Sequence, residues 1–112
     1  MHGHYGGSGA ISAGQSGFLK FTGSGTVAIT LPTITADTVG LEYELANGRT
    51  GIATITVSSN QYYDNIASHV DLTLPAVTGS TVAKCVLRAV DDGSGGNFHW
   101  AVLQLYGGAA IV

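Results

Sequence analysis

The sequence is poor in charged side chains, and this shortage excludes several classes of protein. Only four of its 112 residues are Lys or Arg, and the formal net charge is −3. Nucleic acids and anionic membranes are bound through clustered cations, so neither is an expected partner. No run of 18 apolar residues, the length that spans a bilayer, occurs in the sequence. The segment Met1–Ala10 has neither a basic nor an apolar region, so we expect no signal peptide and synthesis in the cytoplasm.

Residues with typical catalytic or metal-binding chemistry are also scarce. The single cysteine, Cys85, excludes a disulfide framework and a multi-cysteine zinc site, and its apolar surroundings predict a small buried hydrophobe. Glu42 and Glu44 are two residues apart, which places both on one solvated face of a strand. Asp91 and Asp92 open a glycine-rich turn that lacks the EF-hand spacing. We therefore expect no enzymatic activity, no cofactor and no metal site.

Glycine, in contrast, is abundant. The chain has 17 glycines, and charged residues make up 10% of it, against about 25% in an ordinary soluble domain. A surface with so few charges is poorly protected against association. The composition therefore predicts either an assembly or a surface covered by Ser, Thr and Gly.

Apolar and polar residues alternate with a period of two from Phe18 onward. This pattern is typical of strands with one buried face, and it predicts strands at residues 27–31, 41–45, 53–57 and 70–74. Residues 80–90 and 98–106 are apolar on both faces. They predict strands inside a sandwich, or on a sheet whose outer face meets another subunit.

Turn-forming residues separate the predicted strands. Asn47-Gly48-Arg49 indicates a hairpin turn, and no segment shows the 3.6-residue period of a helix. We predict an all-β fold, a seven- to eight-stranded antiparallel sandwich or barrel. It is one β-domain over residues 18–106, with a flexible Gly/Ser-rich N-terminal arm at 1–17 and an apolar tail at 107–112. The tail is expected to dock on its own sheet or on a neighbour.

Aromatic, histidine and apolar terminal residues are the candidates for partner binding. Tyr62 and Tyr63 are adjacent on a polar loop, where they can stack on a sugar or anchor a partner; alternatively, one of them caps the edge of the sandwich. Trp100 is expected in the core or in a subunit interface. The candidates at the two ends of the chain are His2, His4, Tyr5, Ile111 and Val112.

The order of strands and turns resembles small β-modules of tailed-bacteriophage virion proteins. Such modules occur in head fibres, in capsid decoration proteins and in trimeric tail-fibre or tailspike domains. The segments that carry the resemblance are Ile29–Pro32, Tyr43–Asn47, Thr54–Val57, Leu72–Pro75, Ser80–Val90, Asp92–Gly93 and Trp100. The resemblance implies a homotrimer without enzymatic role. The chain lacks a heptad shaft, which favours a compact decoration protein over a fibre.

We therefore expect a structural virion protein, a capsid decoration or cement protein that is made in the host cytoplasm. Its partners would be two further copies of itself and the major capsid protein, contacted through the arm and the tail. The alternative is a tail-fibre, tail-knob or head-fibre domain that binds a host receptor or carbohydrate. A second alternative is a free carbohydrate-binding module that uses Tyr62, Tyr63 and Trp100.

Overall fold

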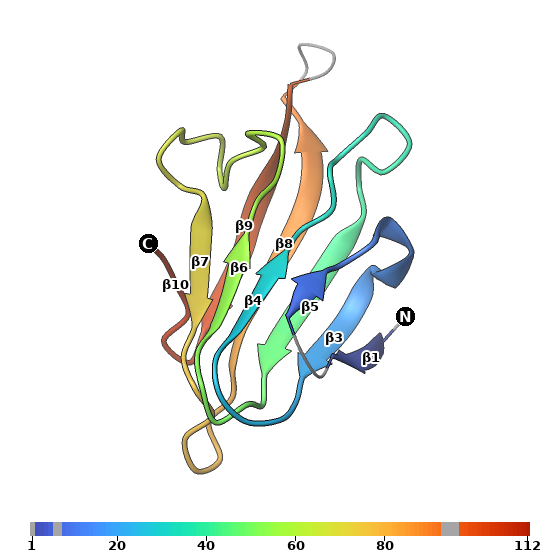
Figure 1. Cartoon of the computed structure of the whole chain (residues 1–112). Coiled ribbons are helices and arrows are strands. Elements are labelled where there is room, and N and C mark those ends of the chain that lie inside the picture. Colours follow the sequence, from blue (N-terminus) through green and yellow to red (C-terminus); the bar gives the residue numbers. More distant parts are fainter. Residues whose placement is uncertain (1, 6–7, 93–96) are drawn as a thin grey trace.

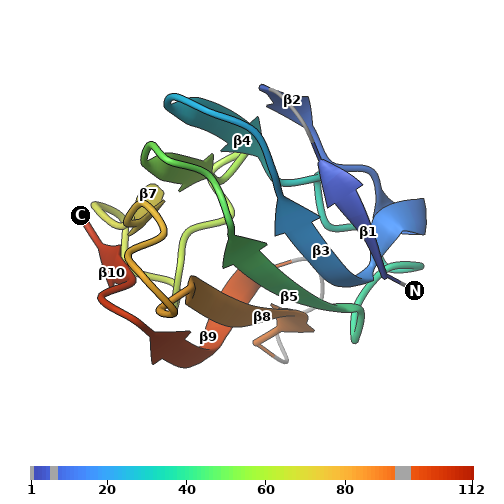
Figure 2. The same cartoon turned by 90° about the horizontal axis from the view of Figure 1, so that it is seen from below.

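The chain forms two facing β-sheets of five strands each (Figures 1 and 2). The computed structural model describes residues 2–5, 8–92 and 97–112, and for residues 2–5 it describes the backbone alone. In spatial order, the first sheet consists of β1 (His2–Tyr5), β3 (Gly17–Phe21), β5 (Glu42–Asn47), β8 (Ala83–Asp91) and β9 (Phe98–Tyr106). The second consists of β10 (Ala110–Ile111), β7 (Asp71–Leu74), β6 (Ala53–Thr56), β4 (Val27–Thr30) and β2 (Gly9–Ala10). A single 3-10 turn, Ala13–Gln15, lies between β2 and β3.

The two sheets are mixed, so the prediction of an antiparallel fold is wrong. From β1 to β6 the chain changes sheet at every connection. A strand that returns to its sheet after crossing the other one runs in its former direction, which makes the pairs β1–β3, β3–β5, β2–β4 and β4–β6 parallel. The later pairs, β5–β8, β8–β9, β6–β7 and β7–β10, are antiparallel. A two-residue period is the same in both kinds of pairing, so it could not distinguish them.

The all-β class is confirmed, and strands lie in each of the six segments where alternation predicted them. The count of seven to eight strands is not confirmed, because segments 2–5, 9–10, 17–21 and 110–111 add to both sheets. Two separate sheets with end strands, rather than a closed barrel, carry the core in the described part of the chain.

The core lies between the sheets and is built from the alternate, inward-facing positions of their strands. β4, β6 and β7 each bury every second residue. The largest side chains with less than 2% exposure include Trp100, Tyr43, Tyr63, Phe21 and Ile11. The rings of Tyr43 and Trp100 meet edge to face, with centroids 5.5 Å apart and planes at 74°. Such a pair contributes beyond the area that it buries.

The end of the predicted N-terminal arm is part of this core. Ile11 is 1% exposed, and its N–H donates to the carbonyl of Thr30 at 2.9 Å. The hydroxyl of Ser8 accepts from the N–H of Ala28 at 3.0 Å, and Tyr43 donates to the carbonyl of Ser12 at 3.2 Å. A free, flexible arm over residues 1–17 is therefore not confirmed. Backbone hydrogen bonds to the edge of β4 hold the segment around Gly9–Ile11 in place. Composition does not reveal such bonds, because every residue type except proline can make them.

The turn at Asn47–Arg49 crosses between the sheets and is not the predicted hairpin. β5 belongs to the first sheet and β6 to the second. The fully buried Asn47 amide donates to the carbonyls of Gly51, Leu74 and Pro75 at 2.8–3.0 Å, and its oxygen accepts from the N–H of Arg49. These bonds satisfy backbone groups of the crossing that a hairpin ladder would otherwise pair.

The buried guanidinium of Arg49 extends this network to the β3–β4 loop. It donates to the carbonyls of Thr22, Ser24 and Gly25. Gly51 is required beside this loop, because a Cβ there would stand 2.2 Å from the carbonyl carbon of Gly25. Asn47 and Arg49 thus hold one end of both sheets together.

Replacing Ile11 by Ala tests whether the N-terminal segment belongs to the fold. We expect the free energy of unfolding in urea to fall by about 2–4 kcal/mol, the usual loss for a fully buried Ile. Ile52→Ala is the control: Ile52 is 46% exposed, so its loss should stay below about 0.5 kcal/mol. Equal, small effects of both changes would show that residues 1–17 are a free arm after all.

Replacing Asn47 by Ala tests the crossing. It leaves three carbonyls and one N–H without their partner, and each buried unsatisfied group costs about 1–3 kcal/mol. We expect a loss of more than about 3 kcal/mol in the free energy of unfolding. Gln104→Ala removes an exposed amide and should be nearly neutral. If the two variants are equally stable, the Asn47 network does not hold the crossing.

Candidate functional site

The predicted aromatic platform is not present as an exposed surface. Tyr63 is fully buried, and its hydroxyl donates to the carbonyl of Ile55 at 2.7 Å. Trp100 is 1% exposed, which confirms it as a core residue, and Tyr62 is half-buried. The loop that holds the two tyrosines lies against β9. The backbone N–H of Trp100 donates to the carbonyl of Tyr62, and the backbone N–H of Asp64 donates to the carbonyl of Trp100. Tyr63 therefore caps the edge of the core, the alternative reading of this pair.

The remaining predicted residues lie at the two ends of the chain. The side chains of His2, His4 and Tyr5 fall outside the described residues, although their backbone forms β1. The tail docks on its own sheet: β10 pairs with β7, and the N–H of Val112 donates to the carbonyl of Asp71 at 3.0 Å. Ile111 is half-buried, whereas Val112 is 70% exposed.

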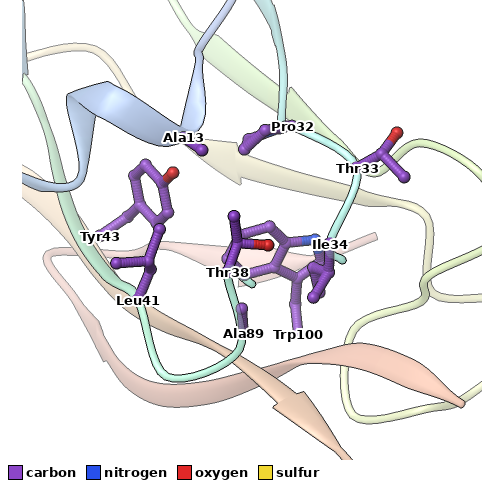
Figure 3. A pocket seen from close by; sticks show the side chains of 9 residues that line it. All are labelled: Ala13, Pro32, Thr33, Ile34, Thr38, Leu41, Tyr43, Ala89 and Trp100. Carbon is purple, nitrogen blue, oxygen red and sulfur yellow. The ribbon is translucent and has the colours of Figure 1, made fainter. Parts of the chain in front are cut away.

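A cleft at one end of the core is filled by side chains. It lies between the connection from β4 to β5 and the inner residues Tyr43, Ala89 and Trp100, and it has no room for a water molecule. Figure 3 shows Thr38 and Ile34 beside the indole of Trp100. The indole N–H is buried and has no hydrogen-bond partner among the described residues. In this structure the cleft is therefore closed by the packing of its lining side chains.

The clearest candidate site is the open side of the two sheets, at the end strands β9 and β10. We define the C-terminal edge as Leu103, Leu105, Ile111 and Val112. Leu103 is 49% exposed and Leu105 is 42% exposed. β9 is the last strand of the first sheet and β10 the last of the second, and Figure 2 shows both on the same side of the molecule.

Register explains why apolar side chains are open to solvent at this edge. Leu105 pairs with Cys85, and Ile111 pairs with Leu72, and both of these partners are fully buried. Paired residues share a face of a sheet, so Leu105 and Ile111 are on the inner side of strands that no further strand covers. A bulge between Val86 and Leu87 shifts the register of β9 beside Leu103.

The turn between the two end strands requires glycine. Gly107 has φ +71°, and a Cβ there would stand 2.8 Å from the Cα of Ala83. The tight turn at Gly107–Gly108 therefore passes against the start of β8. It places β10 on the second sheet directly after β9 leaves the first.

The C-terminal edge carries no charge of its own. From Phe98 to Val112 the sequence contains no Lys, Arg, Asp or Glu. Charged residues are the usual protection of an end strand against pairing with another chain. The first half of β9 is protected by the loop that holds Asp64, because the carboxylate of Asp64 accepts from the N–H of Val102 at 3.0 Å. Sequence analysis named Ile111 and Val112 as partner-binding candidates and placed Leu103 and Leu105 in a strand, 98–106, that is apolar on both faces, but it did not single these two leucines out; the uncharged run 98–112 is the signal that could have done so.

The two glutamates that follow one face of β5 are neutralised by cations from β8. Glu44 forms an ion pair with Lys84 at 3.2 Å, and Glu42 accepts from Nε of Arg88 at 2.9 Å. Within residues 8–92 and 97–112, no three His, Cys, Asp or Glu side chains gather as metal ligands do. No helix in the described ranges has the length and apolarity to cross a membrane.

Comparison of the chain with family models, with curated proteins and with solved structures gave no match.

Two buried groups on the inner faces are held neutral. Burial raises the pKa of the Cys85 thiol to about 12, although a hydrogen bond with the backbone of Leu45 lowers this pKa. Burial also raises the pKa of Tyr63 well above its ordinary value, with smaller contributions from Cys85 and Asp71. A thiol with so high a pKa is a poor nucleophile at neutral pH.

The raised thiol pKa predicts a loss of stability in alkali. The folded chain keeps a proton that the unfolded chain releases above its thiol pKa of about 9. This contribution is therefore fully present below pH 9 and is lost as the pH rises toward 12. Urea unfolding of the chain and of Cys85→Ala should show their stability difference falling by about 1.4 kcal/mol per pH unit in this window. Tyr63 titrates in both proteins, so its effect cancels apart from the smaller part of its pKa shift that comes from Cys85. Parallel curves would contradict the buried thiol.

Proposed function

We propose that the chain is a non-enzymatic structural protein of a bacteriophage virion, a capsid decoration or cement protein that assembles as a homotrimer. The C-terminal edge is the observation that carries the self-association. Leu103, Leu105 and Val112 are 49%, 42% and 70% exposed beside the core. Burying the exposed part of one such side chain contributes roughly half of the 1.5–3 kcal/mol of complete burial. The virion assignment is supported by the resemblance of the strand and turn order to phage β-modules.

The number of three copies is taken from the resemblance, which implies a homotrimer. A head-to-tail contact, in which the C-terminal edge of one copy meets a different surface of the next copy, closes into a ring when the rotation permits. In this proposal the N-terminal segment 1–17 contacts the major capsid protein, and so do the residues of the tail 107–112 other than Ile111 and Val112, which belong to the trimer contact. Three weak contacts held on one trimer bind the shell more tightly than one copy does.

The alternative is a tail-fibre, tail-knob or head-fibre domain that binds a host receptor or carbohydrate. Burial of Tyr63 and Trp100 removes the aromatic platform on which this alternative and a free carbohydrate-binding module depended. A groove on the outer face of the first sheet, lined by Phe18, Lys20, Glu44 and Tyr106 among others, still favours the binding of a receptor or carbohydrate.

Light scattering of the purified chain tests the self-association. We expect a mass three times that of the 11.4 kDa chain. The double variant Leu103→Glu, Val112→Glu places charge on the edge and should give the monomer mass. Ile52→Glu, at a residue 46% exposed at the end of the crossing from β5 to β6, is the matched control and should remain trimeric. A monomer of the unmodified chain at high micromolar concentration contradicts the proposal.

Deletion of the chain from the virus separates the two roles. A virion without a cement protein should keep its adsorption to cells and lose resistance of its shell to heat or chelator. A virion without a receptor-binding domain should lose adsorption and keep shell resistance. The second result would replace decoration by the alternative.

A further inference from the structure

The outer face of the first sheet carries an open groove of about 350 Å³ that spans four strands. Its lining includes Phe18 and Lys20 of β3, Glu44 and Ala46 of β5, Lys84 of β8 and Tyr106 of β9. This volume lies at the lower end of the range for small-molecule sites. The groove faces away from the core and lies apart from Leu103 and Val112.

Register explains the hollow. Lys20 pairs with Ala46, Ala46 with Lys84, and Lys84 with Tyr106, so the four residues form one row across the sheet. Paired residues share a face, and the row therefore places one methyl group between long side chains. Ala46 forms the floor and is only 4% exposed.

The charges of the groove are unequal. Lys84 is paired with Glu44, and its ammonium lies 5.9 Å from the centre of the Tyr106 ring. Lys20 has no ion pair among the described side chains. Strands are about 4.8 Å apart, so the backbones of Lys20 and Lys84 stand about 10 Å from each other. On a chain with net charge −3, the described lining of the groove thus offers one cation without an ion pair and one carboxylate that is already balanced.

Aromatic rings lie at both ends of this arrangement. Tyr106 is 55% exposed, and Phe18 is half-buried on the opposite side of Ala46. An exposed tyrosine presents an apolar ring with a polar tip, which suits the face of a sugar ring and its hydroxyls. Glu44 and Lys84 together provide an acceptor and a donor for hydroxyl groups.

We propose that this groove binds a carboxylated sugar of the uronic-acid class. Lys20 binds the carboxylate, Tyr106 packs on the ring, and the Glu44–Lys84 pair binds hydroxyls. The single ammonium of Lys20 balances the one negative charge of a carboxylate, whereas a phosphate monoester carries about −1.5 to −2 charges at neutral pH and would be only partly balanced. Arg88, on the same face, is already bound to Glu42. The proposal gives the receptor-binding alternative a site and does not depend on trimer formation.

Titration of the isotope-labelled full chain with D-glucuronate, followed by amide NMR shifts, tests the site. We expect saturable shifts at Lys20, Ala46 and Tyr106 with a Kd of about 1 mM, as is usual for a ligand of this size. D-glucose should bind at least about fivefold more weakly, since it lacks the charge. Added salt should weaken glucuronate binding and leave glucose unchanged.

Variants distinguish the effect of the Lys20 charge from a general effect of cations on this face of the sheet. Lys20→Met keeps the aliphatic stem and should weaken glucuronate binding about fivefold or more, to the level of glucose. Arg88→Met removes a cation from the same face outside the groove and should bind like the unmodified chain. Tyr106→Leu should weaken both sugars. Light scattering of each variant shows whether the oligomer is unchanged, which keeps this test separate from that of the C-terminal edge.

Several results would overturn the proposal. These are equal binding of glucose and glucuronate, an equal response to acetate and glucuronate, no shifts at about 20 mM ligand, or equal losses in Lys20→Met and Arg88→Met. If Lys20→Met fails to fold, the preference of the unmodified chain for glucuronate over glucose and its salt dependence decide the question.

Discussion

The buried amide of Asn47 is the interaction on which one end of the molecule depends. The chain crosses between the sheets beside it, and the amide bonds to both sides of that crossing, to Gly51 and to the exit of β7 at Leu74 and Pro75. Arg49, oriented by the same amide, secures the β3–β4 loop. From β1 to β6, where the chain changes sheet at every connection, no hairpin ladder satisfies the backbone groups of the turns, so buried side chains must do so. The bonds of Asn47 and Arg49 supply those partners where three connections meet.

The order in which the chain adds strands to the two sheets also determines which surfaces are left open. Strands β1 to β6 fill both sheets from one side, and the later strands β7 to β10 complete the other. The last two strands are unequal in length, since β9 has nine residues and β10 has two. The short strand leaves the inner side of β9 partly uncovered at Leu105, and the uncharged segment 98–112 offers no electrostatic protection. The proposed self-association through the C-terminal edge would cover what the fold itself leaves exposed.

The charged side chains of the outer face, and not the buried groups of Cys85 and Tyr63, are accessible to a ligand. Cys85 and Tyr63 are held neutral by burial, and Tyr63 is occupied by its bond to Ile55. The outer face of the first sheet, in contrast, carries Lys20, Lys84 and Arg88 among the four cations of the chain. Two of the three are balanced by Glu44 and Glu42. A polar groove on one face and an apolar edge on another are compatible with one molecule that both assembles and binds a small ligand.

The sequence by itself determined the all-β class, the six main strands and the inward positions such as Ile29 and Ile55, because alternation of apolar and polar residues follows directly from the geometry of a strand. It also determined a weakly charged surface and a tail that docks. Only the tertiary structure decided that neighbouring strands are parallel, that Asn47-Gly48-Arg49 is a crossing, and that Tyr63 and Ile11 are core residues. The row from Lys20 to Tyr106 joins residues that lie far apart in the chain. Pairing between distant segments depends on long-range hydrogen bonds and packing, and a two-residue period is the same whichever strand becomes the neighbour.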